Sequence, residues 1–508
     1  MMRLFILSLL FLGHGILRGA TCTLVLHGQG LAAKPAVLYR YDDLLTRRLI
    51  LLTRNDLNAD GRATLMAEVE GRTRARLRVG EAVTDLYLMP GATYMLDLSV
   101  PSGKPRSIGA TTALEVVFQD LDPLDINALT SDLNERIDLF VAEGLASDER
   151  AGMDAATTAR QGGALRDTSH RPTTVYLNPA ALLARVDSFA AKLRRFYAQV
   201  QDPFFQHELD YAIAGLYAGA QASPRHIWQQ WIKGRAIAYG SPEQMRFLRG
   251  FFEKHLLMFP FRAQEQRLLA SIRNAQRDSL DALVARHDFL RDDARLRELV
   301  WLDNLYTEYF GRTFDRKGML DLMQQVERTS AFAEHRLLAA NMRWDLTAMK
   351  PGATFPIMRL SDPTGELVEV NTLLEGPICF AVTASWCSWC AVEIEALKKL
   401  DAAYGKLVHF VVVSVDSSQA DFRKLAGSYT STSWHWLQAG ADPLFMDALR
   451  LRSIPAFFLL NDRELSHAPA PLPSSGMVDV FHRLKVEAEQ RNAIRFGSDA
   501  PAPTRPER

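Results

Sequence analysis

The sequence predicts a multi-domain protein with an N-terminal antiparallel β-sandwich, a central all-α domain and a C-terminal α/β domain. Two observations lead to this prediction. At 508 residues the chain is longer than one hydrophobic core usually supports. Its apolar residues recur first at every second position, then at helical spacing, and then in alternating strand and helix patterns. We expect the β-sandwich at 22–115, the helical domain at 116–348, the α/β domain at 349–490 and a disordered tail at 491–508.

The first residues have the pattern of a secretory signal peptide, which we expect at 1–20. A basic start at Met1-Met2-Arg3 precedes an apolar run from Leu4 to Leu12. This run is too short to span a membrane, so we expect an exported protein that is soluble or tethered at its N-terminus. Lys plus Arg and Asp plus Glu both total 59, and this balance gives no reason to expect nucleic acid as a partner.

Cys22 lies two residues after the end of this expected signal peptide. Gly19-Ala20-Thr21-Cys22 resembles a bacterial lipoprotein box in part, but the usual Leu is missing and Thr21 is a poor residue before the cysteine. Two interpretations stay open: an N-terminal lipid anchor at Cys22, or a free cysteine at the start of a strand.

Alternating apolar residues and frequent turn residues indicate the β-sandwich. We expect strands at 23–27, 36–39, 49–52, 64–67, 86–89 and 94–98. Between two of them, Asp56 to Gly61 copies the start of a calcium-binding EF-hand loop. The twelfth position of such a loop requires a bidentate Glu, whereas this chain has Ala67 there. We therefore expect a turn at this point and no metal site.

The central domain has helical periodicity. We expect helices within 181–200, 268–272, 296–309 and 319–326. The segment 151–172 has few large apolar residues, so we expect a loop there. Trp228 and Trp231 lie at helical spacing, which indicates core packing and not a cofactor site. This domain shows no recognisable chemistry.

Beyond Lys350-Pro351-Gly352 the pattern becomes that of an α/β domain. We expect strands at 377–382, 408–415 and 456–460, and helices at 390–404, 419–425, 443–449 and 478–489. The run 408–415 has the continuous apolar character of a central strand.

The most informative segment is Ser385-Trp386-Cys387-Ser388-Trp389-Cys390, between a predicted strand and a predicted helix. A structural zinc site needs a second pair of ligands, and the only other cysteines are Cys22 and Cys379. We therefore predict a dithiol that opens and closes as a redox-active disulfide, with no metal and no other cofactor. At a helix N-terminus, unpaired backbone N–H groups favour a thiolate. Cys387 is thus the expected attacking thiol, and Cys390 the thiol that resolves the mixed disulfide.

From 352 to 489 the sequence resembles the thioredoxin superfamily, specifically the TlpA/ResA-like envelope thiol-disulfide oxidoreductases. The residues that carry this resemblance are 384–390, Glu393, 408–416 and Ile454-Pro455. The resemblance implies that Pro455 forms a cis peptide bond beside the dithiol and that Ile454 offers backbone groups to a substrate strand. It also implies that Glu393 tunes the cysteines, although Glu393 could instead be a solvated helix residue.

Three residues beside the catalytic cysteines complete the expected site. Trp386, Ser388 and Trp389 are predicted to contact the substrate. Trp389 replaces the Pro that the family usually has between the cysteines, and Ala381 stands where cytoplasmic thioredoxins have a buried Asp. Two features outside this set have ordinary explanations. Cys379 is expected to be a buried hydrophobic residue, and Trp434-His435-Trp436 could rim a substrate groove or anchor a loop.

The predicted function is an exported thiol-disulfide oxidoreductase that reduces or exchanges disulfides in client proteins. The resemblance implies a periplasmic or cell-envelope location, a membrane thiol-electron donor and a route into cytochrome c biogenesis. Three alternatives stay open. The protein could be a redoxin-type peroxidase that uses Cys387, or an envelope binding or scaffold protein with an accessory thioredoxin-like module. The cysteine pair could also be a structural disulfide, which an exported protein permits.

Overall fold

The computed structural model has two compact units. The first consists mainly of the chain up to Asp345, and the second mainly of the chain from Leu346 onward. The structure describes residues 19–80, 82–101, 112–161, 179–258, 264–416, 418–440, 443–451 and 453–498. The expected signal peptide lies outside these ranges, apart from its last two residues. Within these ranges, no helix has both the length and the apolar character needed to cross a membrane.

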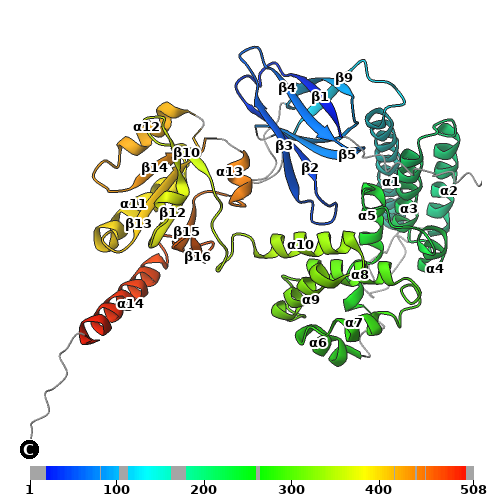
Figure 1. Cartoon of the computed structure of the whole chain (residues 1–508). Coiled ribbons are helices and arrows are strands. Elements are labelled where there is room, and N and C mark those ends of the chain that lie inside the picture. The colour runs from blue at the N-terminus through cyan, green and yellow to red at the C-terminus, as the bar shows by residue number, and fades with distance from the viewer. Residues whose placement is uncertain are drawn as a thin grey trace, which may run out of the picture. The chain divides into compact units, whose positions relative to one another are not determined.

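The N-terminal part of the first unit contains two sheets (Figure 1). One sheet has the order β4-β1-β7-β9, formed by Arg62–Val69, Ala20–His27, Thr93–Ser99 and Glu115–Gln119. The other has the order β3-β2-β5-β6-β8, formed by Leu49–Asp56, Pro35–Tyr41, Thr73–Val79, Ala82–Leu88 and Thr112–Ala113.

The expectation of a purely antiparallel region is wrong at one pair of strands. β1 and β7 run parallel, with Leu24 opposite Tyr94. The alternation within each strand predicts which side chains are buried, but it does not contain the direction of the neighbouring strand. β1 and β7 are far apart in sequence, so no hairpin forces them to be antiparallel.

The segment that copies an EF-hand start forms a turn between β3 and β4, as expected. Asn58 Oδ1 accepts hydrogen bonds from the backbone N–H groups of Asp60 and Arg62, at 3.0 and 2.9 Å. Gly61 has a φ of 71°, a left-handed conformation that glycine adopts without steric cost.

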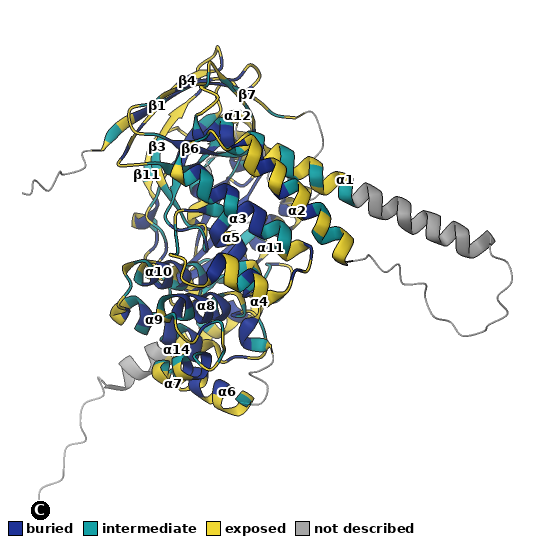
Figure 2. Ribbon diagram, turned by 90° about the vertical axis from the view of Figure 1, so that its right-hand side faces the viewer, coloured by how far each residue is buried: buried dark blue, intermediate teal, exposed yellow. Residues whose placement is uncertain are grey.

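Helices form the rest of the first unit. They are α1 (Ile126–Gln161), α2 (Pro179–Phe196), α3 (Pro203–Gly219), α4 (Pro224–Ile227), η1 (Trp228–Ile232), α5 (Pro242–Phe251), η2 (His255–Leu257), α6 (Glu265–Arg273), α7 (Arg277–Val284), α8 (Ala294–Thr307), α9 (Arg316–Thr329) and α10 (Ala333–Thr347). α8 is buried along most of its length (Figure 2). Trp231 is buried, as expected of a core residue.

The loop expected at 151–172 is wrong for its first part, because α1 continues to Gln161. The residues from 162 to 172 lie outside the described part of the chain. The helical part is rich in Ala, which has the highest helix propensity of all residues but gives no amphipathic signal. A shortage of large apolar residues therefore does not by itself indicate a loop.

A seven-stranded sheet is the centre of the second unit, with the order β11-β10-β14-β13-β12-β15-β16. Its strands are β10 (Arg359–Ser361), β11 (Leu367–Glu369), β12 (Pro377–Thr383), β13 (His409–Ser414), β14 (His435–Gln438), β15 (Ala456–Asn461) and β16 (Glu464–His467). β12, β13 and β14 are parallel, and β15 is antiparallel to β12. The continuous apolar run at 408–415 thus forms β13, a central strand, as predicted.

The helices of this unit are η4 (Val370–Leu373), α11 (Ser388–Tyr404), α12 (Gln419–Gly427), α13 (Pro443–Ala448) and α14 (Met477–Ser498). Apolar clusters cover both faces of the sheet: one contains Ile394 and Leu397 of α11, and the other contains Phe380 and Val411. α14 ends at Ser498, so the start of the expected disordered tail at 491 is wrong. The residues after 498 lie outside the described part.

Candidate functional site

The two cysteines of the C-x-x-C segment form a disulfide at the start of α11. Cys387 is the N-cap residue of this helix, and its Sγ accepts a hydrogen bond from the backbone N–H of Cys390 at 3.1 Å. Cys387 is partly exposed, whereas Cys390 is fully buried. Their Cα atoms are 5.2 Å apart. The sulfur that solvent can reach is therefore the one at the helix N-terminus, where negative charge is stabilised.

A buried carboxylate fixes the loop that leads into this helix. Asp416 follows β13 and is 2% exposed. It accepts hydrogen bonds from the backbone N–H of Ser385 at 2.9 Å, from Ser385 Oγ at 2.8 Å and from Ser414 Oγ at 2.6 Å. Because Ser385 lies two residues before Cys387, these bonds fix the position of the segment that leads to the exposed sulfur.

Glu393 lies one turn after Cys390 and is fully buried. Its carboxylate accepts hydrogen bonds from the backbone N–H of Ser474 at 3.0 Å and from Ser474 Oγ at 2.7 Å. Glu393 is therefore not a solvated helix residue. The contacts connect α11 to the segment before α14.

The peptide bond between Ile454 and Pro455 is cis. β15 begins at the next residue, and its antiparallel register with β12 places Ala456 opposite Val382. Pro455 therefore lies at the end of the sheet where β12 leads into the C-x-x-C segment. Both Ile454 and Pro455 are partly exposed.

The residues expected to contact substrate are exposed around Cys387. Trp386 is 69% exposed and Trp389 is 58% exposed, and Ser388 between them is also exposed. The two indoles therefore form an exposed apolar surface beside the sulfur.

The other two cysteines lie apart from this site. Cys379 is buried in β12, and burial raises the pKa of its thiol. Cys22 is buried in β1, where it pairs with Ala67, and burial is the main cause that raises the pKa of its thiol. Among the residues that the structure describes, no group of three or more His, Cys, Asp or Glu side chains is arranged to hold a metal ion.

Trp434 and Trp436 are less than 10% exposed and belong to the core cluster on the α11 side of the sheet. Both rings lie against Tyr429, with centroids 5.7 and 5.5 Å away. These contacts favour the interpretation that the two tryptophans anchor their segment.

Sequence reasoning missed two residues of the site, Asp416 and Ser474. Asp416 carried a signal, because an acidic residue that directly follows a buried parallel strand lies at the carboxyl edge of the sheet, where sites of α/β folds collect. Ser474 lies in a connecting segment 81 residues after Glu393, and no local pattern connects the two.

The sheet, the disulfide at the start of α11 and the cis-proline before β15 give the second unit the arrangement of a thioredoxin-like fold. No family model and no curated protein matches the chain. Solved structures of thiol-disulfide oxidoreductases are similar to about a quarter of the chain.

Three such structures, all from Bacteroides, illustrate the similarity. A crystal structure of a proposed thiol-disulfide oxidoreductase from Bacteroides vulgatus is 23% identical, with a TM-score of 0.24, and the match covers 26% of this chain and 95% of that one. A solution structure of a proposed thiol-disulfide oxidoreductase from the same species is 31% identical, with a TM-score of 0.23, covering 26% and 87%. A thiol:disulfide interchange protein from Bacteroides sp. is 19% identical, with a TM-score of 0.24, covering 27% and 88%.

Proposed function

We propose that this protein is an exported thiol-disulfide oxidoreductase that reduces or exchanges disulfides in client proteins through Cys387 and Cys390. The observation that carries the proposal is the asymmetry of the disulfide. Its exposed sulfur caps a helix N-terminus, and its second sulfur is fully buried one turn away. In this geometry one thiol can attack an incoming substrate, and the other can resolve the mixed disulfide and release the product.

The reaction begins with both cysteines reduced. The Cys387 thiolate attacks one sulfur of a client disulfide, forms a mixed disulfide and releases the other client sulfur as a thiolate that takes up a proton. The Cys390 thiol loses its proton and attacks Cys387 Sγ, which closes the intramolecular disulfide and expels the second client thiolate. Two electrons have then passed from the protein to the client, and a membrane thiol-electron donor returns them.

The neighbouring residues have separate roles in this proposal. Trp386, Ser388 and Trp389 contact the client beside the sulfur. Ile454 offers backbone groups to an extended client segment, and cis-Pro455 keeps that segment close to the disulfide. Glu393 is buried one helical turn after Cys390, and in this proposal it tunes the reactivity of the two thiols.

A trapping experiment tests this function. Cys390→Ser should leave client proteins attached to Cys387 as mixed disulfides, which non-reducing gels and mass spectrometry detect. Cys387→Ser is the matched control, because it keeps a buried thiol but removes the exposed one. Wild-type protein should also reduce insulin disulfides, and Cys387→Ser should not.

The same variants test the alternatives. Loss of peroxide consumption in Cys387→Ser, without any insulin reduction by the wild type, would identify a redoxin-type peroxidase. Equal activity of wild type and Cys387→Ser, together with a partner bound by the first unit, would identify a scaffold with an accessory module. The proposal includes export, a periplasmic or cell-envelope location and a link to cytochrome c biogenesis. The identities of the trapped clients would test these parts, because each client has a known compartment and pathway.

A further inference from the structure

A cavity of about 270 Å³ lies within the first unit, between the β2–β3 connection, β5, β6 and the start of α5. Its charged lining is mainly basic. The charged residues that line it are Arg47, Arg74, Asp85, Glu243, Arg246 and Arg249. Nothing in the proposed redox function uses this cavity.

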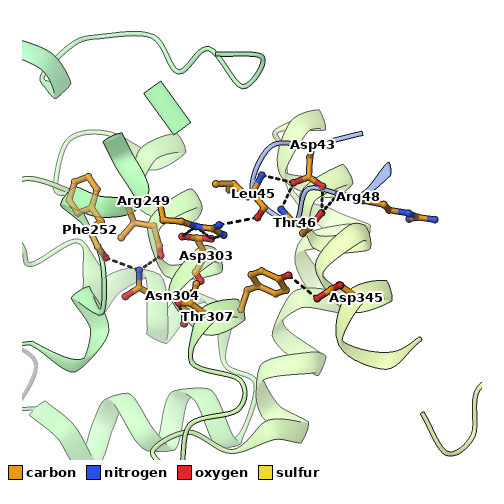
Figure 3. Close-up of polar contacts among 12 residues, drawn as sticks. Asp43, Leu45, Thr46, Arg48, Arg249, Phe252, Asp303, Asn304, Thr307 and Asp345 are labelled. Atoms are coloured by element: carbon orange, nitrogen blue, oxygen red, sulfur yellow. Dashed lines mark hydrogen bonds and ion pairs between the residues drawn. The ribbon is translucent and has the colours of Figure 1, made fainter. Parts of the chain in front are cut away.

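The wall formed by the β2–β3 connection is held in place by hydrogen bonds (Figure 3). Arg249 Nη1 donates to the carbonyl oxygen of Leu45 at 2.9 Å. Asp43 Oδ1 accepts from the backbone N–H groups of Leu45 and Thr46 at 2.8 and 2.7 Å, and its Oδ2 accepts from Asn341 Nδ2 at 2.8 Å. The cavity is therefore already shaped before any ligand enters.

Two of the four arginines already have carboxylate partners of their own. Arg249 Nε contacts the two carboxylate oxygens of Asp303 at 3.2 and 3.1 Å. Arg246 pairs with Glu243. Within each pair, the positive and negative charges neutralise one another. The net charge of the cavity therefore depends on Arg47, Arg74 and Asp85.

Asp85 forms its hydrogen bonds with Arg76 and Tyr41, and it also lies within ion-pair distance of Arg47 and Arg74. Its oxygens accept from Arg76 Nε at 2.8 Å and Arg76 Nη2 at 3.3 Å, and the Tyr41 hydroxyl lies 2.8 and 2.9 Å from the two oxygens. Burial alone would raise the pKa of Asp85, but the hydrogen bonds and charge of Arg76 outweigh it and lower the pKa. Asp85 is therefore a single negative charge that Arg76 already balances.

Arg47 and Arg74 remain as an excess of positive charge. Their Nη2 atoms lie 3.7 and 3.8 Å from the same oxygen, Asp85 Oδ2, which is beyond hydrogen-bond length. The Arg74 guanidinium lies 4.7 Å from the ring centroid of Tyr87, a contact that restrains it. Asp85 thus faces three guanidiniums, those of Arg47, Arg74 and Arg76, so one carboxylate balances only one of three positive charges, and a second oxyanion beside Arg47 and Arg74 would offset the excess.

We propose that Arg47 and Arg74 form an oxyanion site that takes the carboxylate or phosphate group of a small ligand. The guanidinium fork matches both groups in shape and in charge. A second cavity, of about 320 Å³, shares Arg74 and is lined on one side by Met245, Leu337 and Leu338. These side chains, with Leu44 and Leu45, give the second cavity an apolar part beside its charged residues, and an apolar portion of the ligand would fit against it. The ligand class in this proposal is therefore a small organic acid or a phosphate ester.

The acidic groups around the second cavity do not cancel this charge. Asp42 pairs with Arg40 at 3.2 Å, and Glu334 pairs with Arg295 at 3.1 Å. Asp43 forms its hydrogen bonds within the β2–β3 connection and with Asn341. Its negative charge acts on the nearby Arg249.

Isothermal titration calorimetry on the full chain, at constant ionic strength, tests the site with inorganic phosphate and with succinate as probes. We expect saturable binding of at least one probe. Arg47→Gln and Arg74→Gln should each weaken it about tenfold, the effect typical of losing one charge-assisted hydrogen bond. Tighter binding of phosphate would identify the phosphate ester as the ligand class, and tighter binding of succinate the organic acid.

Arg54→Gln is the matched control, because it removes the same charge from β3 of the same sheet, where Arg54 pairs with Asp56 at 3.5 Å outside both cavities. Arg47 is 60% exposed, so its substitution leaves the fold intact. Binding by neither probe, or equal weakening by Arg54→Gln, would overturn the proposal. The result is independent of the dithiol, because Cys387→Ser should bind the probes as the wild type does.

Discussion

Asp416 offers the sharpest test of how the site is held together. Its carboxylate accepts hydrogen bonds from three donor groups: the backbone N–H and the hydroxyl of Ser385, and the hydroxyl of Ser414. Each such bond contributes roughly 1 kcal/mol net. We therefore expect Asp416→Ala to lower the free energy of opening of the segment Ala384–Cys390 by about 3 kcal/mol. Asp416→Asn, which keeps one acceptor oxygen, should lower it by about half as much.

Hydrogen exchange followed by mass spectrometry measures this free energy for the segment itself, which matters because a chain with two compact units need not unfold in one step. Asp421→Asn is the matched control. It removes the same charge from an exposed position on α12 and should change the opening free energy by less than about 0.5 kcal/mol. Unchanged protection of Ala384–Cys390 in Asp416→Ala would refute the role given to Asp416.

Three further predictions concern the first unit. Burial raises the pKa of Glu208 from 4.5 to about 7, so its stabilising contribution is complete below pH 4.5 and is lost as the pH rises to 7; in thermal melts at pH 8, Glu208→Gln should be more stable than wild type by up to about 3 kcal/mol. Burial, followed by the charge of His287, lowers the pKa of His255 from 6.5 to about 4, so stability in thermal melts should fall as the pH falls through that window. His255→Gln should reduce this dependence, and His287, whose pKa burial also lowers, accounts for the rest. A Cβ on Gly318 would lie 2.0 Å from the carbonyl oxygen of Ile272, so Gly318→Ala should cost about 1–3 kcal/mol in chemical denaturation, whereas Gly215→Ala, with open space in α3, should gain up to about 1 kcal/mol.

The sequence was a good guide where a local pattern decides the structure. The apolar run of β13, the C-x-x-C segment at the start of α11 and the turn before β4 could all be predicted, because each depends on residues close together in the chain. β5 was missed although Ala75, Leu77 and Val79 alternate as buried residues, since the arginines between them hid the pattern.

Contacts between distant segments could not be predicted in the same way. The parallel pairing of β1 with β7 depends on which strands meet after the chain folds, and the sequence of either strand does not contain that information. The hydrogen bonds between Glu393 and Ser474, and the excess charge at Arg47 and Arg74, likewise need three-dimensional proximity.

The burial of Cys22 and Cys379 has a consequence for how this protein matures. Four cysteines can pair in three complete ways, but in the folded chain only the Cys387–Cys390 pair reaches solvent, through the partly exposed Cys387. If oxidation precedes folding, Cys22 or Cys379 can form wrong crosslinks, and packing of their strands would then bury those crosslinks away from the exposed Cys387. The order of folding and oxidation therefore matters. In a chain that packs its strands first, the thiols of Cys22 and Cys379 are shielded before any oxidant reaches them.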